Sequence, residues 1–113
     1  MRELNLTQSI LDKALQKARQ SNATRIQSLQ LAMGEISELD QNAIRGHWRE
    51  LSRGTLAEHA QLLFRLIQAE VQCMACFGKY HPQQGKIHCP YCGSYGAKIL
   101  SGEEFYLESI ELE

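Results

Sequence analysis

The chain has 113 residues, which suits one domain and excludes two of full size. Hydrophobic residues make up 43% and charged residues 22%, as in ordinary globular proteins. Twelve basic residues against thirteen acidic ones give a formal charge of -1, so we expect no general attraction to nucleic acid or to anionic membranes.

The N-terminus predicts a cytoplasmic protein. Its first ten residues include acidic and polar side chains where a signal peptide has an apolar stretch. No apolar run in the chain reaches the roughly 18 residues that cross a bilayer. The cytoplasm keeps thiols reduced, so its cysteines are more often metal ligands than disulfide partners.

The opening segment predicts a helix followed by a strand. Asn5 is expected to cap a helix over residues 6–20, where apolar side chains recur at the spacing of one helical face. Residues 25–34 then alternate polar and apolar side chains, which is the pattern of a half-buried strand. Gly34 is expected to end this strand.

A second helix and two further strands are expected. Asp40 is a suitable N-cap for a helix with Ile44 and Trp48 on its apolar face. Residues 61–71 predict one long strand, and residues 105–110 predict a strand near the C-terminus. The expected fold is therefore α+β, with two helices on one face of a small sheet and an inserted zinc-ribbon lobe that has four cysteine ligands.

All four cysteines lie in the inserted lobe. Two CxxC pairs, separated by twelve residues, consist of Cys73, Cys76, Cys89 and Cys92. Two such turns supply four thiolates to one tetrahedral Zn²⁺ ion. Gly78 and Gly93 follow the pairs and are expected at positive φ. We therefore divide the chain into residues 1–72 with 103–113 and a zinc-binding lobe of residues 73–102.

Other interpretations of the cysteines and histidines stay open at this point. Iron in a rubredoxin-like site uses the same ligand set as zinc. His81 and His88 lie near the cysteines, but loop histidines without a metal role are more common. His47 and His59 have no visible ligand or base partner, and no catalytic motif is present. We therefore expect a protein that is not an enzyme.

Several segments together resemble the HypA/HybF family of nickel-insertion accessory proteins. They are MRELNLTQSIL at the start, RIQSLQLAMGEISELD, GTLAEHAQLLF, the two CxxC pairs and ESIELE at the end. The resemblance covers the whole chain. It implies a nickel metallochaperone that works with a maturation GTPase to deliver Ni²⁺ to the large subunit of [NiFe]-hydrogenase.

The resemblance also implies roles for individual residues. Both CxxC pairs match the zinc ligands of the family, and Glu3 matches the acid in the MHE start of the family. Asp40 falls at a position near the nickel site of some members. Residue 2 departs from the family, which has histidine there, because the guanidinium of Arg2 has no lone pair to donate. The Met1 amine, the backbone amides of residues 2 and 3, and the Glu3 carboxylate remain as nickel ligands.

Three functions follow from these observations. The first is a nickel metallochaperone with structural zinc. The second is a zinc-stabilised docking adaptor that has lost high-affinity nickel binding. The third, a nucleic-acid-binding zinc ribbon, lacks a basic patch, because Lys79, Lys86 and Lys98 are scattered. Exchange of the final strand between two chains would give a homodimer.

Overall fold

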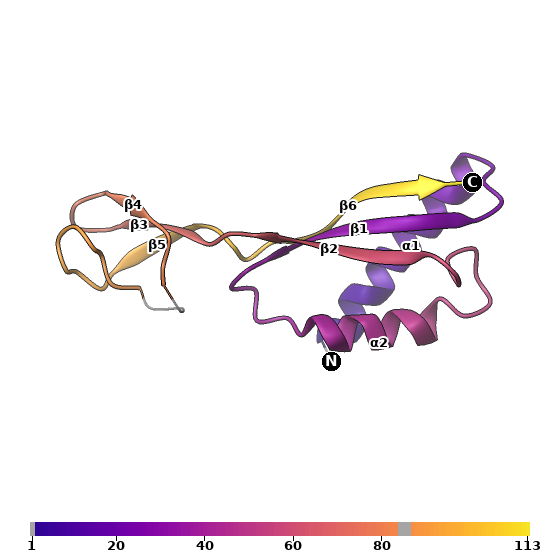
Figure 1. Ribbon diagram of the computed structural model, residues 1–113, viewed down its shortest axis with the longest axis horizontal. Helices are drawn as coiled ribbons and strands as arrows, with labels where there is room; N and C mark the ends of the chain where they lie inside the picture. The colour runs from indigo at the N-terminus through magenta and orange to yellow at the C-terminus, as the bar shows by residue number, and fades with distance from the viewer. Residues whose placement is uncertain (1, 84–86) are drawn as a thin grey trace. The chain divides into compact units, whose positions relative to one another are not determined.

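A computed structural model of the chain describes residues 2–83 and 87–113 (Figure 1). The chain divides into two compact units. The first contains residues 1–31, 39–65 and 106–113, and the second contains residues 32–38 and 66–105. In the described part of the chain, no helix combines the length and apolar character required to span a membrane.

Helix α1 (Arg2–Gln20) begins earlier than the sequence predicts. Asn5 lies inside the helix and does not cap it, so that prediction was wrong. Glu3 in the first turn complements the positive end of the helix dipole, which favours the longer helix. The buried face of α1 is formed by Thr7, Ile10, Leu11, Ala14 and Ala18.

Helix α2 (Gln41–Leu51) has the predicted N-cap. The Asp40 side chain accepts hydrogen bonds from the amides of Asn42 at 2.9 Å and Ala43 at 3.3 Å. These amides have no carbonyl partner inside the helix, so the carboxylate stabilises the first turn. The buried residues of α2 are Ile44 and Trp48, as the apolar spacing predicts, and α2 packs against α1.

The first sheet has the strand order β2-β1-β6 and lies beside the two helices (Figure 1). Its strands are β1 (Ile26–Gly34), β2 (Gln61–Ile67) and β6 (Phe105–Leu112). Leu29 and Leu31 of β1 are fully buried, but Ser28 and Ala32 on the other face are buried as well, so the prediction of a half-buried strand was wrong. Leu62 of β2 is buried, whereas Leu66 on the same strand is 62% exposed.

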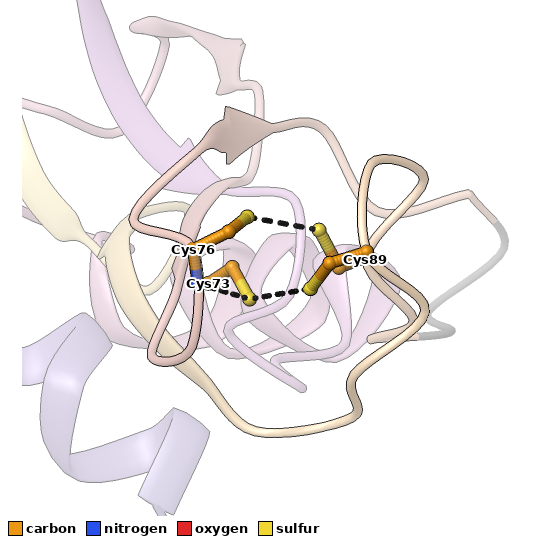
Figure 2. A group of neighbouring side chains, drawn as sticks. Cys73, Cys76 and Cys89 are labelled. Atoms are coloured by element: carbon orange, nitrogen blue, oxygen red, sulfur yellow. Dashed lines mark hydrogen bonds between the residues drawn. The ribbon is translucent and has the colours of Figure 1, made fainter.

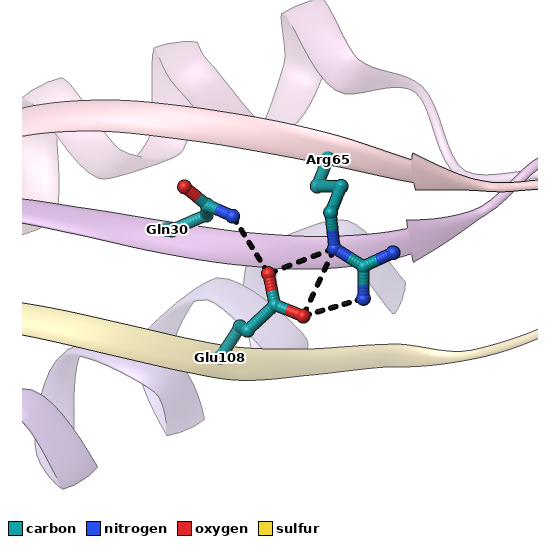
Figure 3. A network of polar contacts seen from close by, with 3 residues as sticks. All are labelled: Gln30, Arg65 and Glu108. Carbon is teal, nitrogen blue, oxygen red and sulfur yellow. Dashed lines mark hydrogen bonds and ion pairs between the residues drawn. The ribbon is translucent and has the colours of Figure 1, made fainter.

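A polar network crosses all three strands of this sheet. The Glu108 carboxylate of β6 accepts a hydrogen bond from the Gln30 amide at 2.7 Å and pairs with the Arg65 guanidinium (Figure 3). Both helices lie behind the strands in this view, so the network lies on the face of the sheet that the helices do not cover. The hydrogen bonds from Arg65 and Gln30 lower the pKa of Glu108 to about 2. The contribution of ionised Glu108 to the free energy of unfolding is fully present above the ordinary carboxyl pKa. It is lost as the pH falls towards 2.

The second unit contains another three-stranded sheet, with the order β4-β3-β5. Its strands are β3 (Glu70–Cys73), β4 (Lys79–Tyr80) and β5 (Ala97–Ser101), and β3 is antiparallel to both neighbours. The single strand predicted over residues 61–71 is therefore two strands. The amide of Ala69, between them, donates to the Glu35 carboxylate at 2.7 Å and not to a sheet partner. The α+β class is confirmed, although the second sheet was not predicted.

Two glycines bring separate segments of the second unit together. The Gly34 amide donates to the carbonyl of Glu104 at 2.7 Å, and the Ile36 amide donates to the carbonyl of Gly102 at 2.8 Å. A Cβ atom on Gly34 would lie 2.0 Å from the Gly102 carbonyl oxygen. Gly34 is therefore required by this close approach of two backbones.

We predict that Gly34→Ala destabilises the protein by about 2 kcal/mol or more, since the new methyl group must displace backbone atoms. Gly46→Ala is the matched control, because Gly46 lies inside α2 and a Cβ there meets nothing within 4 Å. This control should raise the free energy of unfolding by about 0.5–1 kcal/mol. Urea denaturation measures the free energy of unfolding of both variants. Equal stability of the two would contradict the claim that the close approach to Gly102 requires glycine at position 34.

Candidate metal centre

The four cysteine sulfurs converge on one point of the second unit (Figure 2). All four Sγ atoms lie within 4.8 Å of one another. The sulfurs of Cys73 and Cys92 are 3.5 Å apart, and those of Cys76 and Cys89 are 3.7 Å apart. A disulfide bond has a length of about 2.05 Å, whereas sulfurs around a tetrahedral zinc ion are separated by about 3.8 Å. The spacing therefore fits a metal site and not two disulfides.

Two backbone turns of the same design position these sulfurs. In the first, the amide of Cys73 donates to the carbonyl of Gly78 at 2.9 Å, and the amide of Phe77 donates to the carbonyl of Cys73 at 3.0 Å. In the second, the amide of Cys89 donates to the carbonyl of Ser94 and the amide of Gly93 to that of Cys89, at 2.9 and 3.0 Å. Equivalent hydrogen bonds give both CxxC pairs the same conformation.

The positive φ that these turns require falls one residue after each pair. Gly93 has φ +81°, as predicted, but in the first turn Phe77 takes this conformation with φ +62°. The prediction of a positive φ at Gly78 was therefore wrong. A Cβ on Gly78 would lie 2.8 Å from the Tyr91 ring, so this glycine provides space and not a special φ. The left-handed conformation is strained for a residue such as Phe77.

Backbone amides donate to the cysteine sulfurs. The sulfur of Cys73 accepts from the amides of Ala75 at 3.3 Å and Cys76 at 3.5 Å, and the sulfur of Cys89 accepts from the amide of Tyr91 at 3.4 Å. Donors of this kind stabilise a negatively charged thiolate. The site is therefore built to hold sulfur in its metal-binding form.

The pKa values of the thiols are driven apart by their surroundings. Hydrogen bonds with the side chain and amide of Ser94 lower the pKa of Cys92 to about 6. The amides of Cys76 and Ala75 lower the pKa of Cys73. The Gly78 amide lowers the pKa of Cys76, but partial desolvation of its sulfur and hydrogen bonds with the neighbouring sulfurs outweigh this effect and raise the pKa to about 11. A cation bound by four thiolates must displace the remaining protons.

The hydrophobic core around this cluster is small. It consists of Val71, Tyr80 and two of the cysteines themselves, Cys73 and Cys89, with Ile87 and Ala97 packed partly buried against it. Cys76 and Cys92 are exposed. Two of the four fully packed positions are thus candidate metal ligands, so the apolar contacts alone are a weak source of stability.

The histidines take other positions. The ring Nδ1 of His81 lies 2.8 Å from the Ala69 carbonyl oxygen, and His88 stacks on Tyr95 with ring centroids 4.8 Å apart. His59 lies 3.6 Å from the Glu58 carboxylate. Within residues 2–83 and 87–113, the potential metal-binding group contains the four cysteines and no histidine.

Two of the expected nickel-site residues lie close together in the first unit. The Glu3 carboxylate accepts a hydrogen bond from the Asp40 amide at 3.2 Å. This bond is the largest of the influences that lower the pKa of Glu3. Arg2 is the first residue of α1, and Met1 lies outside the described residues.

The sequence analysis did not identify Ser94, whose hydroxyl contacts the Cys92 sulfur. Ser94 follows the second cysteine pair, and no signal in the sequence distinguishes it from an ordinary turn residue.

Known proteins match this chain over its whole length. The family model described as "Hydrogenase/urease nickel incorporation, metallochaperone, hypA" matches residues 1–112. The protein named hydrogenase maturation factor HypA from Caldanaerobacter subterraneus subsp. tengcongensis is 30% identical over 114 residues, covering 100% of both chains. Its namesake from Dehalococcoides mccartyi strain 195 is 32% identical over 113 residues, covering 100% of this chain and 95% of that protein.

Solved structures share the fold. The solution structure of the Ni metallochaperone HypA from Helicobacter pylori aligns with a TM-score of 0.69 at 22% identity, covering 97% of this chain and 96% of that one. Another solution structure of a HypA protein aligns with a TM-score of 0.75 at 22% identity, covering 100% and 97%. The resemblance stated from the sequence is confirmed, and the chain belongs to the HypA family of nickel-incorporation metallochaperones.

Proposed function

We propose that this chain is an accessory metallochaperone of [NiFe]-hydrogenase maturation in the cytoplasm. It assists nickel insertion into the hydrogenase large subunit together with a maturation GTPase. The family match over residues 1–112 carries this proposal. The protein is not an enzyme in this account, because it binds and releases an ion without making or breaking covalent bonds.

The four cysteines hold a structural zinc ion in this proposal. Cys73, Cys76, Cys89 and Cys92 provide four sulfur donors, and the spacing of their sulfurs suits tetrahedral Zn²⁺. Four protein ligands leave no open position, so the ion would stabilise the lobe of residues 73–102 and would not activate water. Iron fits the same four sulfur donors, and elemental analysis of the purified protein distinguishes it from zinc.

Nickel is the cargo, and we assign it to the start of α1. The Glu3 carboxylate, with its lowered pKa, is ionised at neutral pH. The amides of residues 2 and 3 coordinate a metal ion through nitrogen once they lose their protons. The Met1 amine, these amides and Glu3 form the proposed ligand set, with Asp40 beside it. Residues 1–72 with 103–113 form the proposed nickel lobe.

One set of observations favours the alternative of an adaptor without high-affinity nickel binding. Arg2 has no lone pair for a metal. Asp40 caps α2, and Glu3 accepts a hydrogen bond from the Asp40 amide, so both carboxylates also have structural roles. Helix N-termini favour anions over cations, which further weakens a nickel site at this position.

The zinc assignment predicts the result of removing one ligand. Purified protein should contain about one zinc per chain, and Cys89→Ala should lose it because three thiolates no longer close the site. Met74→Ala is the control, since Met74 lies between the first two cysteines but is 59% exposed. Elemental analysis measures the content, and full zinc retention by Cys89→Ala would contradict the assignment.

The nickel assignment predicts a gain of affinity on Arg2→His. The new imidazole adds a ligand and removes a fixed positive charge, so we expect nickel to bind about tenfold more tightly, a difference of about 1.4 kcal/mol. Arg19→His in the last turn of α1 should leave nickel binding unchanged. Calorimetric titration measures both variants, with zinc content measured alongside.

An N-terminal extension that blocks the Met1 amine should weaken nickel binding by the native chain and leave zinc in place. Equal nickel affinity of the native, extended and Arg2→His proteins would show that the N-terminus is not the site. Absence of nickel binding by the native chain, with binding restored by Arg2→His, would support the adaptor.

A further inference from the structure

Phe77 combines a strained backbone with an exposed side chain. Its φ is +62°, yet its side chain is 67% exposed. The equivalent position of the second cysteine turn holds Gly93, which adopts a positive φ without a steric cost. Glycine would therefore suit the first turn better, and an exposed phenyl ring adds little to the packing of its own lobe. Strained residues are often found at functional sites, so the ring of Phe77 is a candidate contact for a partner.

A row of three polar residues crosses the second sheet. Gln72 of β3 lies opposite Lys79 of β4 and also opposite Lys98 of β5. Directly opposed residues of antiparallel strands point to the same face of a sheet. The buried Val71 and Cys73 alternate with Gln72 along β3, so the row lies on the face away from this core. Both lysines of the row are exposed.

A hydrogen bond connects the row to Phe77. The side-chain amide of Gln72 donates to the Phe77 carbonyl at 2.9 Å. Phe77 is also only two residues before Lys79 in the chain. The backbone of Phe77 is therefore held beside the row, and its exposed ring and the two ammonium groups belong to one stretch of surface.

This part of the chain is cationic. The sequence from residue 71 to residue 102 contains three lysines and no aspartate or glutamate. A zinc ion with four thiolates would carry two negative charges, which the lysines outweigh. Glu70, opposite Ser101, is the acidic residue nearest to the row along β3. Neither Lys79 nor Lys98 forms an ion pair within residues 2–83 and 87–113. A surface of this charge is complementary to an acidic partner.

We propose that Phe77 and the row of Lys79, Gln72 and Lys98 form a docking surface for an extended acidic segment of a partner polypeptide. Carboxylates of the segment pair with the two ammonium groups, and an apolar side chain of the segment covers the Phe77 ring. Single-stranded nucleic acid also combines cation contacts with aromatic stacking. Two lysines offer few phosphate contacts, and the whole chain has a formal charge of -1, so the polypeptide is favoured.

The test titrates the purified full chain with the peptide acetyl-Glu-Ala-Glu-Leu-amide and follows its backbone amides by NMR. Three further probes are titrated separately: the peptide with both Glu replaced by Gln, the peptide with Leu replaced by Ala, and oligothymidine of about eight nucleotides. We expect saturable shifts at Phe77, Lys79 and Lys98 with the first peptide. Each of the other probes should bind more weakly, because it lacks the carboxylates, the apolar side chain or both.

Variants separate docking from folding. Phe77→Gly should raise the dissociation constant of the first peptide about fivefold, while the midpoint of thermal unfolding stays the same or rises. Lys79→Gln and Lys98→Gln should each raise the dissociation constant about threefold, as expected for exposed ion pairs. Leu63→Ala and Lys17→Gln are the matched controls, since both replace exposed side chains of the first unit, and neither should change binding.

Four binding results would overturn the proposal. They are the absence of a saturable shift, equal binding of the Glu and Gln peptides, unchanged binding by Phe77→Gly, and binding of oligothymidine in preference to the first peptide. A lower midpoint of thermal unfolding for Phe77→Gly would also overturn it, because the ring would then serve the folding of its own lobe.

Discussion

The convergence of four cysteine sulfurs within 4.8 Å is the constraint on which the second unit depends. Thiolates brought this close repel one another, and a divalent cation converts that repulsion into attraction. The backbone meets the constraint with two turns that share their hydrogen-bond pattern, and Phe77 accepts a left-handed conformation for this purpose. The surrounding core is small, because Cys73 and Cys89 are themselves half of it, and under our proposal a bound metal supplies the missing stability.

The first unit rests on a different source of stability. Its core combines the apolar faces of two helices with the buried side of a three-stranded sheet, and it contains no cysteine. The acidic residues at the start of its helices have structural partners, since Asp40 caps α2 and Glu3 accepts the Asp40 amide. A nickel ion at the proposed site would compete with these hydrogen bonds.

Local signals in the sequence predicted much of this structure. The spacing of the CxxC pairs anticipated the sulfur cluster, and the position of Asp40 anticipated the cap of α2. Features that depend on distant segments were not predictable in this way. The break between β2 and β3 accompanies a hydrogen bond from Ala69 to Glu35, and the need for Gly34 arises from the backbone of Gly102. No periodicity in the sequence records such contacts.

Amide hydrogen exchange before and after treatment with a zinc chelator tests the proposed metal dependence of the second unit most directly. We predict that the amides of Cys73 and Cys89, which are bonded to the carbonyls of Gly78 and Ser94, lose their protection on chelation. Amides inside α1 and β1, including those of Leu11 and Leu29, should keep theirs. Unchanged protection at Cys73 and Cys89 in metal-free protein would contradict the account, because it would show that the second unit folds without a metal.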